Sequence, residues 1–209
     1  MTGSRGRNTQ RRIEIAGMAA RILVDDGRMN YSTARRKAAD RIGYTGTRDL
    51  PDNREIDAAL RAYQALFAAP AQAEHLNALR RHAVAAMRLL APFDPRLAGP
   101  VLAGTARTHD PVVLHLFAET LEEVTVFLLD RDIPFELGER RFPGSDKPCP
   151  RFRFLAGDVQ MELVVFPPQS RHRPPPSEID GRPMQRATLD QVQALLPDAT
   201  AAVSRTFTP

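Results

Sequence analysis

A glycine and a threonine at the end of an apolar run are the first residues of this sequence that could do chemistry. Gly104-Thr105 closes the run 97–103, and such a pair is either a simple turn or a place where backbone amides approach a phosphate. His115 stands inside the run VVLHLF, where a histidine is either a satisfied core residue or a ligand. Glu162 alternates with Met161 and Leu163, so it either belongs to a site or faces solvent from one side of a sheet.

Several common site patterns are absent. The sequence has no G-x-x-x-x-G-K-[ST] phosphate loop, no G-x-G-x-x-G after a strand, no G-x-S-x-G nucleophile elbow and no H-E-x-x-H zinc spacing. The single cysteine, Cys149, forms no disulfide framework and no cysteine metal site. These absences argue against P-loop NTPases, Rossmann dehydrogenases, serine hydrolases and zinc peptidases, and the sequence predicts no metal site of its own.

Helical spacing dominates the first part of the chain and strand patterns the second. Apolar residues recur at helical spacing over 13–25, 31–42, 52–67 and 74–90, and Pro70 is expected to end the third of these helices. The run 112–117 predicts a buried strand, 133–136 another, and the segments around Gly157-Asp158 a hairpin. Thr120 with Glu123 and Thr188 with Gln191 predict two capped helices.

Charge and proline usage divide the chain near the same place. Residues 1–88 carry 16 basic and 9 acidic residues, whereas residues 89–209 carry 13 and 16 and hold 16 of the 18 prolines. We expect an α+β fold in which an N-terminal helical domain precedes a small mixed β-sheet flanked by helices. The predicted parts are a flexible basic tail (1–12), a helical domain (13–78), the sheet domain (79–168), and a proline-rich loop with a last helix (169–209).

Residues 80–120 read as helix, APFDPRLAGPVLAGTA, polar loop, DPVVLHLF and capped helix. Here the sequence resembles the nucleotidyltransferase-fold superfamily, the polymerase-β-like domains, over about residues 80–166. In that family a strand ends in Gly-Ser, the next strand bears an Asp-x-Asp pair, and a later strand supplies a third carboxylate. The resemblance implies that Gly104 and Thr105 bind a nucleotide and that Glu162 stands for the third carboxylate. An active member would also need Mg²⁺ or Mn²⁺ with a nucleoside triphosphate, because the metals bridge the phosphates.

The sequence departs from the family at the Asp-x-Asp pair. The best register places Asp110 at the serine, Pro111 at the first aspartate and Val113 at the second, and neither Pro111 nor Val113 can ligate a metal through its side chain. We therefore expect a degenerate member whose nucleotidyl transfer is weakened or lost, and which could retain nucleotide binding. The alternative is a rescued activity, with Asp110 and Glu162 as the main catalytic candidates beside His115 and Glu119.

The basic first part offers a different class of function. Helices 13–25 and 31–42 could form a unit like a helix-turn-helix, and its second helix carries Arg35, Arg36, Lys37 and Arg41. These side chains would face the phosphates of a nucleic acid, or they would form an ordinary solvated helix face. The alternative function is thus a non-catalytic nucleic-acid- or protein-binding module.

No stretch approaches the ~20 apolar residues of a membrane-spanning helix. The N-terminal arginines are not followed by an apolar run, so a secretory signal is not expected. We expect a cytoplasmic protein with no membrane partner, while the pattern leaves the oligomeric state open.

Overall fold

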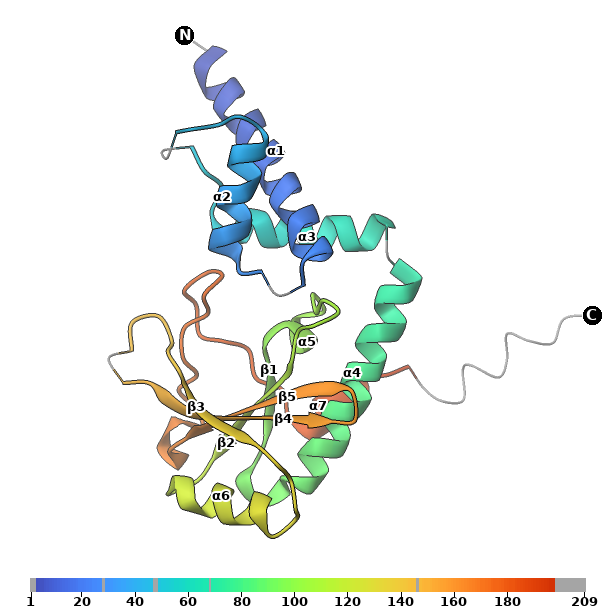
Figure 1. Cartoon of the computed structure of the whole chain (residues 1–209), viewed down its shortest axis with the longest axis vertical. Coiled ribbons are helices and arrows are strands. Elements are labelled where there is room, and N and C mark those ends of the chain that lie inside the picture. Colours follow the sequence, from blue (N-terminus) through green and yellow to red (C-terminus); the bar gives the residue numbers. More distant parts are fainter. Residues whose placement is uncertain (1–2, 28, 47–48, 68, 146, 198–209) are drawn as a thin grey trace, which may run out of the picture.

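The computed structural model describes residues 3–27, 29–46, 49–67, 69–145 and 147–197, and it shows an α+β protein (Figure 1). The chain begins with three helices that pack on one another, α1 (Gly3–Asp25), α2 (Tyr31–Arg41) and α3 (Asn53–Phe67). Their inward side chains, among them Ile15, Leu23 and Ile56, form a separate apolar core. The helical spacing read from the sequence therefore predicts these helices correctly.

The first helix begins earlier than expected. Residues 3–12, predicted as part of a flexible tail, belong to α1, and the remaining two tail residues lie outside the described part. The structure differs from the prediction there, and two arginines of this segment, Arg11 and Arg12, have partners in the rest of the helical part. Arg12 donates from Nε to Glu55 Oε1 at 3.0 Å, and the Arg11 guanidinium lies 5.1 Å from the Tyr44 ring centroid.

A second core surrounds a five-stranded mixed sheet of order β1-β2-β5-β4-β3. The central pair, β2 with β5, is parallel and the other pairs are antiparallel. The strands are β1 (Arg96–Ala98), β2 (Val112–Phe117), β3 (Glu136–Arg140), β4 (Cys149–Ala156) and β5 (Val159–Phe166). The helices of this part are α4 (Ala69–Leu89), α5 (Gly99–Ala103), α6 (Leu121–Leu129) and α7 (Leu189–Ala194), with short 3₁₀ turns at Ala91–Phe93 and Pro168–Ser170.

The two faces of the sheet differ because side chains alternate along each strand. One face, here called the helix-covered face, presents a row of apolar residues that pack with side chains of α4, α6 and α7; Leu114, Leu163 and Phe152 lie side by side in it. The other, here called the polar face, carries His115, Glu162, Arg151 and Arg153 beside a small apolar cluster. The buried strand 112–117 and the hairpin at Gly157-Asp158 are confirmed.

The run Leu97–Ala103 is divided between two elements. Its strand ends at Ala98, and Gly99, with φ of 71°, leads into α5. Pro100 has no N–H for a strand ladder but is well suited to a first helical turn. As a result Gly104, with φ of 80°, is the residue that ends α5 rather than the end of a strand. The expectation that Gly104-Thr105 follows a strand was wrong.

Two further boundaries shift. The strand expected at 133–136 runs over Glu136–Arg140, because residues before it finish the turn that ends α6: the Ile133 N–H bonds the Leu128 carbonyl, and Asp132 has φ of 51°. Pro70 lies in the first turn of α4, which begins directly after α3, so the proposed division at residues 78 and 79 falls inside one helix. In Figure 1 this helix runs from the three-helix part down along the sheet.

The segment after β5 returns toward the helices. Residues 175–184 form a narrow loop with an isolated bridge between Pro176 and Pro183, and Figure 1 shows it rising toward α3. Asn53 Nδ2 donates to the Glu178 carbonyl at 2.7 Å. Thr188 and Gln191 form the predicted capping box of α7, and of the predicted part 169–209 the residues 198–209 lie outside the description. Among the described helices none is long and apolar enough to span a membrane.

Candidate functional site

A cleft of about 410 Å³ lies where the three-helix part meets the sheet part. We call it the central cleft. Its walls come from α2 and α3, from α5 and Thr105, from β3 with the chain that follows, and from the loop 177–185. The lining residues are Tyr31, Asp57, Arg61, Gly99, Pro100, Leu102, Ala103, Thr105, Arg140, Phe142, Ser177, Glu178, Ile179, Asp180, Arg182, Pro183, Met184 and Gln185. A pocket of this size accommodates a small organic ligand.

The helical wall of the cleft is a connected polar network. Tyr31 Oη donates to Asp57 Oδ1 at 3.0 Å, and Arg61 Nε donates to Asp57 Oδ2 at 2.9 Å. Arg61 also donates from Nη1 to the Ala103 carbonyl at 3.1 Å, which joins α3 to the end of α5. Burial, and then the neighbouring Asp57 charge, raise the pKa of Tyr31. The phenol therefore stays protonated and acts as a hydrogen-bond donor.

Thr105, one of the predicted nucleotide-binding residues, lines the central cleft. Its backbone N–H donates to the Pro100 carbonyl at 3.0 Å, which closes the turn after α5, and its own carbonyl accepts from Gln64 Nε2 at 3.5 Å. Gly104 precedes it but is not among the described residues that line the cleft. The predicted Gly-Thr pair thus contributes one residue to the cleft, and the glycine that directly follows a strand and lines it is Gly99.

Glu162, the predicted third carboxylate, is buried among three arginines. It accepts from Arg140 Nη1 at 2.6 Å through Oε1 and from Arg153 Nε at 3.1 Å through Oε2, while Arg151 Nη1 lies 3.7 Å from Oε2. We call these four residues the arginine cluster. Only 3% of Glu162 is exposed, and Arg140 is the member whose side chain reaches the central cleft. The cluster holds three positive charges for one negative charge.

His115 is fully buried on the same polar face. Its Nδ1 accepts from Arg186 Nε at 2.9 Å, so the ring proton is on Nε2, which has no partner among the described residues. Burial, with the charges of Arg186 and Arg140, holds the pKa of His115 well below its usual range. The histidine is therefore neutral, and the satisfied-core alternative holds for Nδ1 alone, because Nε2 is buried without a partner among the described residues.

Arg186 is a half-buried cation that lies over aromatic rings. Its guanidinium stands 4.9 Å from the Phe166 ring centroid and 5.1 Å from that of Phe117. Nη1 donates to the carbonyls of Ser170 and Arg171, but no carboxylate pairs with Arg186 in the described part of the chain. Burial first, and then the neighbouring Arg96 charge, lower the pKa of Arg186 to about 10. Positive charge thus dominates this region of the polar face.

Asp110, the other catalytic candidate, has a structural partner. Its Oδ1 accepts from Arg107 Nη2 at 2.8 Å and its Oδ2 from the Arg107 backbone N–H at 2.9 Å. Arg107 in turn donates to the Met29 carbonyl at 2.8 Å, so the pair connects this loop to the chain before α2. Asp110 does not line the central cleft and makes no recorded contact with Glu162. The structure does not bring the two candidate carboxylates into one site.

The metal ions of the family do not fit the residues present. In the sheet register Val113 stands directly beside Glu162, and the same side of β2 carries His115 two residues later. A valine offers no ligand, the histidine is bonded to an arginine, and the glutamate oxygens face guanidinium groups. Within the described residues no group of three or more His, Cys, Asp or Glu side chains could hold a metal ion.

The basic residues of α2 are arranged unevenly. Arg36, Lys37 and Arg41 are exposed, whereas Arg35 is half-buried and donates to the Pro51 carbonyl at 3.2 Å. Asp40 is exposed on the same helix and interrupts the positive charge. Three of the four predicted nucleic-acid-binding residues are therefore accessible, and the fourth has a structural role.

Sequence reasoning missed the residues that give the polar face its charge. The alternation in RFRFLAG places Arg151 and Arg153 on one face of a strand, a signal that could have been used. Arg186 follows a proline-rich loop, and nothing in its local sequence indicates that it reaches His115. Tyr31 and Asp57 stand on separate helices, and their bond depends on how those helices pack.

Comparison of the chain with protein-family models, with curated proteins and with solved structures gives no match.

Proposed function

We propose that this protein is a nucleotidyltransferase-like binding protein that takes a nucleotide in the central cleft and does not transfer it. The single observation that carries this proposal is the polar face of the sheet. Where the resemblance calls for the Asp-x-Asp pair stand Pro111 and Val113, of which Val113 lies directly beside Glu162, and the Glu162 carboxylate is already paired with arginines. A face of this kind attracts phosphate groups but cannot hold a pair of divalent ions.

The order of elements supports the family likeness. A long helix, a strand, a glycine turn, a strand and a capped helix follow one another from α4 to α6, as in the resemblance read from the sequence. The glycine in this turn is Gly99, which has positive φ and lines the central cleft. A backbone without a side chain at that point lets a ligand approach closely. We assign the glycine position of the motif to Gly99 in place of Gly104.

The composition of the cleft supports a phosphate-bearing ligand. Arg61, Arg140 and Arg182 line it from three different segments, and one arginine side chain can bind two oxygens of a phosphate. The lining also holds three carboxylates, those of Asp57, Glu178 and Asp180, and Arg61 is paired with the first of them. Thr105, Ser177 and the protonated Tyr31 add hydroxyl groups of the kind that bond a ribose or a base edge. Leu102, Phe142 and Met184 give it an apolar part for a planar ring.

Nucleotide binding is tested with a fluorescent ATP analogue and its displacement by unlabelled ATP. We expect binding that Mg²⁺ does not strengthen, and a loss of about tenfold in affinity in Arg140→Gln, because one charge-assisted contact is removed. Arg81→Gln is the matched control, since Arg81 is exposed on α4 and outside the cleft. No binding at millimolar nucleotide, or equal effects of the two variants, would contradict the proposal.

The absence of transfer is tested separately. The purified protein is incubated with α-labelled nucleoside triphosphates, Mn²⁺ or Mg²⁺ and cell extract, and labelled protein or nucleic acid is sought. We expect no product above that of Glu162→Gln. A product that the wild-type chain forms and Glu162→Gln does not would show that Glu162 is catalytic after all.

A second candidate function rests on the exposed side of α2. Arg36, Lys37 and Arg41 form a small basic surface there, which would bind nucleic acid through its phosphates. This function predicts that the logarithm of the association constant falls linearly with the logarithm of the salt concentration. The double variant Arg36→Ala with Lys37→Ala should show a shallower slope, because it neutralises fewer phosphates. Binding that is unchanged by salt and by the two substitutions would exclude it.

A further inference from the structure

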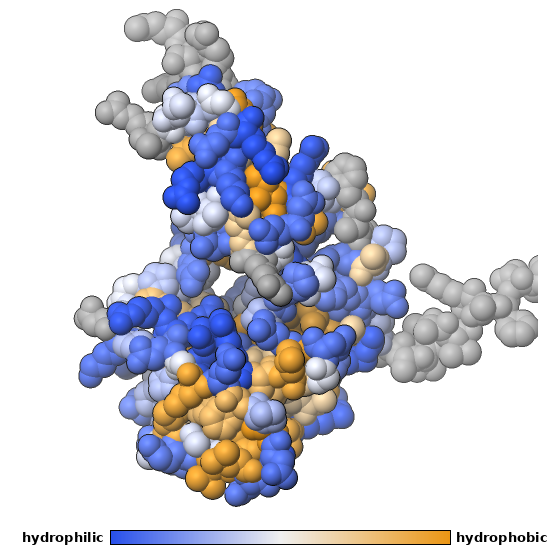
Figure 2. Space-filling model, viewed as in Figure 1, coloured by the Kyte–Doolittle hydropathy of each residue, from blue (hydrophilic) through white to orange (hydrophobic). Residues whose placement is uncertain are grey.

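The edge of the sheet at β3 is open and partly apolar. Strand β3 pairs with β4 on one side, and no described segment pairs with its other side. Leu137 in β3 is 56% exposed and Leu155 at the end of β4 is 65% exposed. Figure 2 shows a broad apolar area over the lower part of the molecule, where α6 and these strands lie. An exposed strand edge next to apolar surface is a place where another strand can be added.

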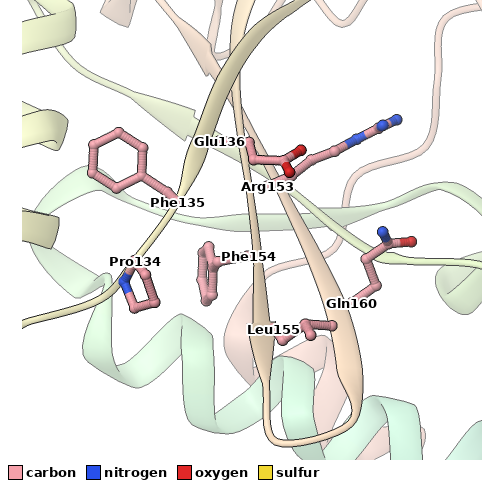
Figure 3. A pocket seen from close by; sticks show the side chains of 7 residues that line it. All are labelled: Pro134, Phe135, Glu136, Arg153, Phe154, Leu155 and Gln160. Atoms are coloured by element: carbon pink, nitrogen blue, oxygen red, sulfur yellow. The ribbon is translucent and has the colours of Figure 1, made fainter.

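A hollow of about 360 Å³ adjoins this edge where the chain enters β3. Figure 3 shows Phe135 and Phe154 with Pro134 on one side of it, and Glu136, Arg153 and Gln160 toward the other. Its walls thus combine aromatic surface with one exposed carboxylate, Glu136, which stands beside Arg153. A surface of that composition suits an arginine side chain, because the aliphatic stem can pack on apolar groups while the guanidinium pairs with a carboxylate or stacks on an aromatic ring.

The charges of β3 are arranged symmetrically about Gly138. The strand reads Glu136-Leu137-Gly138-Glu139-Arg140. If two copies pair antiparallel with a two-fold axis at Gly138, each Glu136 stands opposite an Arg140 and each Leu137 opposite a Glu139. Moving the two-fold axis from Gly138 to Glu139, the next residue along the strand, would instead place the two Glu139 side chains opposite each other, and like charges directly opposite each other disfavour pairing. Gly138 at the axis has no side chain to hinder the approach.

We propose that the protein forms a two-fold dimer in which β3 pairs with β3 of a second copy about Gly138. The charges along β3 would oppose like charges in many other strands, whereas in this two-fold register Glu136 of each copy faces Arg140 of the other. In this register Arg141 of one copy stands opposite Phe135 of the other, at the mouth of the hollow. The sheets of the two copies become continuous, and the exposed Leu137 side chains are covered. Arg140 also pairs with Glu162 and lines the central cleft, but the dimer does not require that the cleft be occupied.

The test uses two substitutions of one residue. Sedimentation equilibrium of the full chain over a concentration series gives the dimer dissociation constant. We expect Leu137→Asp to raise it at least about tenfold, because the introduced carboxylate then stands opposite Glu139 on both sides of the two-fold axis. Leu137→Lys removes the same apolar group but places an ammonium group opposite Glu139, so we expect the constant to stay within about threefold of wild type.

A second matched pair tests the charge pattern. Glu136→Lys opposes a lysine to Arg140 and should weaken the dimer about tenfold, whereas Glu14→Lys makes the same charge change on the exposed side of α1 and should have no effect. Circular dichroism checks that each variant is folded. A wild-type chain that stays monomeric at high concentration overturns the proposal. So does a dimer that Leu137→Lys weakens as much as Leu137→Asp, or one that Glu136→Lys leaves intact.

Discussion

The two faces of the sheet are built from the same strands and yet have opposite character. On the helix-covered face Leu114, Leu163 and Phe152 are fully buried and in register beneath α4, α6 and α7. On the polar face, one residue along each strand, stand Val113, Glu162 and Arg153. The first face stabilises the fold through burial of apolar surface. The second places a carboxylate among arginines, which stabilises a fold only when every charge is matched.

This difference indicates where the molecule can have a function. Fully buried apolar rows leave no polar group for a ligand, and a change there alters packing alone. The polar face holds the neutral His115, the half-buried Arg186 without a carboxylate partner among the described residues, and Arg140, the member of the arginine cluster that reaches the central cleft. Polar groups of this kind are found more often at functional sites than in an apolar core.

The largest effect should come from the helix-covered face. We expect Phe152→Ala to lower the free energy of unfolding by about 3–5 kcal/mol, because the buried ring leaves a cavity that the surrounding side chains cannot fill. The adjacent Arg153→Ala, on the polar face, should cost less than about 1 kcal/mol, since its ion pair is partly exposed. Urea denaturation measures both. Equal losses would mean that the two faces do not differ in the way described.

A smaller effect is expected at the carboxylate of the polar face. Glu162→Gln should lower the free energy of unfolding by about 2 kcal/mol, because the arginine cluster then has no negative charge and its guanidinium groups repel one another. Glu136 is the exposed residue that pairs with Arg153 across β3 and β4, and Glu136→Gln should change the free energy of unfolding by less than about 0.5 kcal/mol. Added salt should partly restore Glu162→Gln by screening. If the free energy of unfolding of Glu162→Gln equals that of the wild type and does not change with salt, the charges of the arginine cluster do not interact as described.

The smallest effect concerns the neutral histidine. Because the pKa of His115 is lowered in the folded protein, the unfolded chain takes up a proton more readily as the pH falls below about 6.5. This contribution to stability is complete above that pH and is lost as the pH falls toward the lower folded-state pKa, by at most about 1.4 kcal/mol per pH unit.

The variant His115→Gln keeps an acceptor for Arg186 and removes the titration. Its free energy of unfolding should therefore fall less between pH 7.5 and 5.5 than that of the wild type in paired urea titrations. His172→Gln, at an exposed position, is the control and should retain the wild-type pH dependence. Parallel curves for wild type and His115→Gln would mean that His115 is not buried in the neutral form.

Local patterns were sufficient for most elements of the fold. The four N-terminal helices, the buried strand β2, the hairpin of β4 and β5 and the capping box at Thr188 follow from periodicity, turn residues and capping pairs. Boundaries failed where distant partners or backbone strain intervened. The helix α1 begins before the predicted residue 13, and Arg12 in its added part pairs with Glu55. The run expected to be a strand becomes the helix α5 from Gly99 onward, because Pro100 fits a first helical turn.

The candidate site was predictable only in part. Thr105 does line the cleft, and Glu162 does lie on the sheet near it, but Asp110 belongs to a separate ion pair. The resemblance to a known family assigned roles by aligning this sequence with the family's motif, and such an alignment does not show which side chains face each other in space. Arg140 and Arg186, which determine the charge around Glu162 and His115, come from segments with no pattern that connects them.

By itself the sequence determined the alternation of faces in the strands and the starts of the capped helices α6 and α7, because those choices depend on neighbours a few residues away. Only the tertiary structure decided that β2 and β5 lie side by side, that a loop following them brings Arg186 to His115, and that the cleft forms between two separate cores. The physical reason is that these contacts join residues far apart in the chain, and their free energy comes from burial and charge pairing that no local window contains.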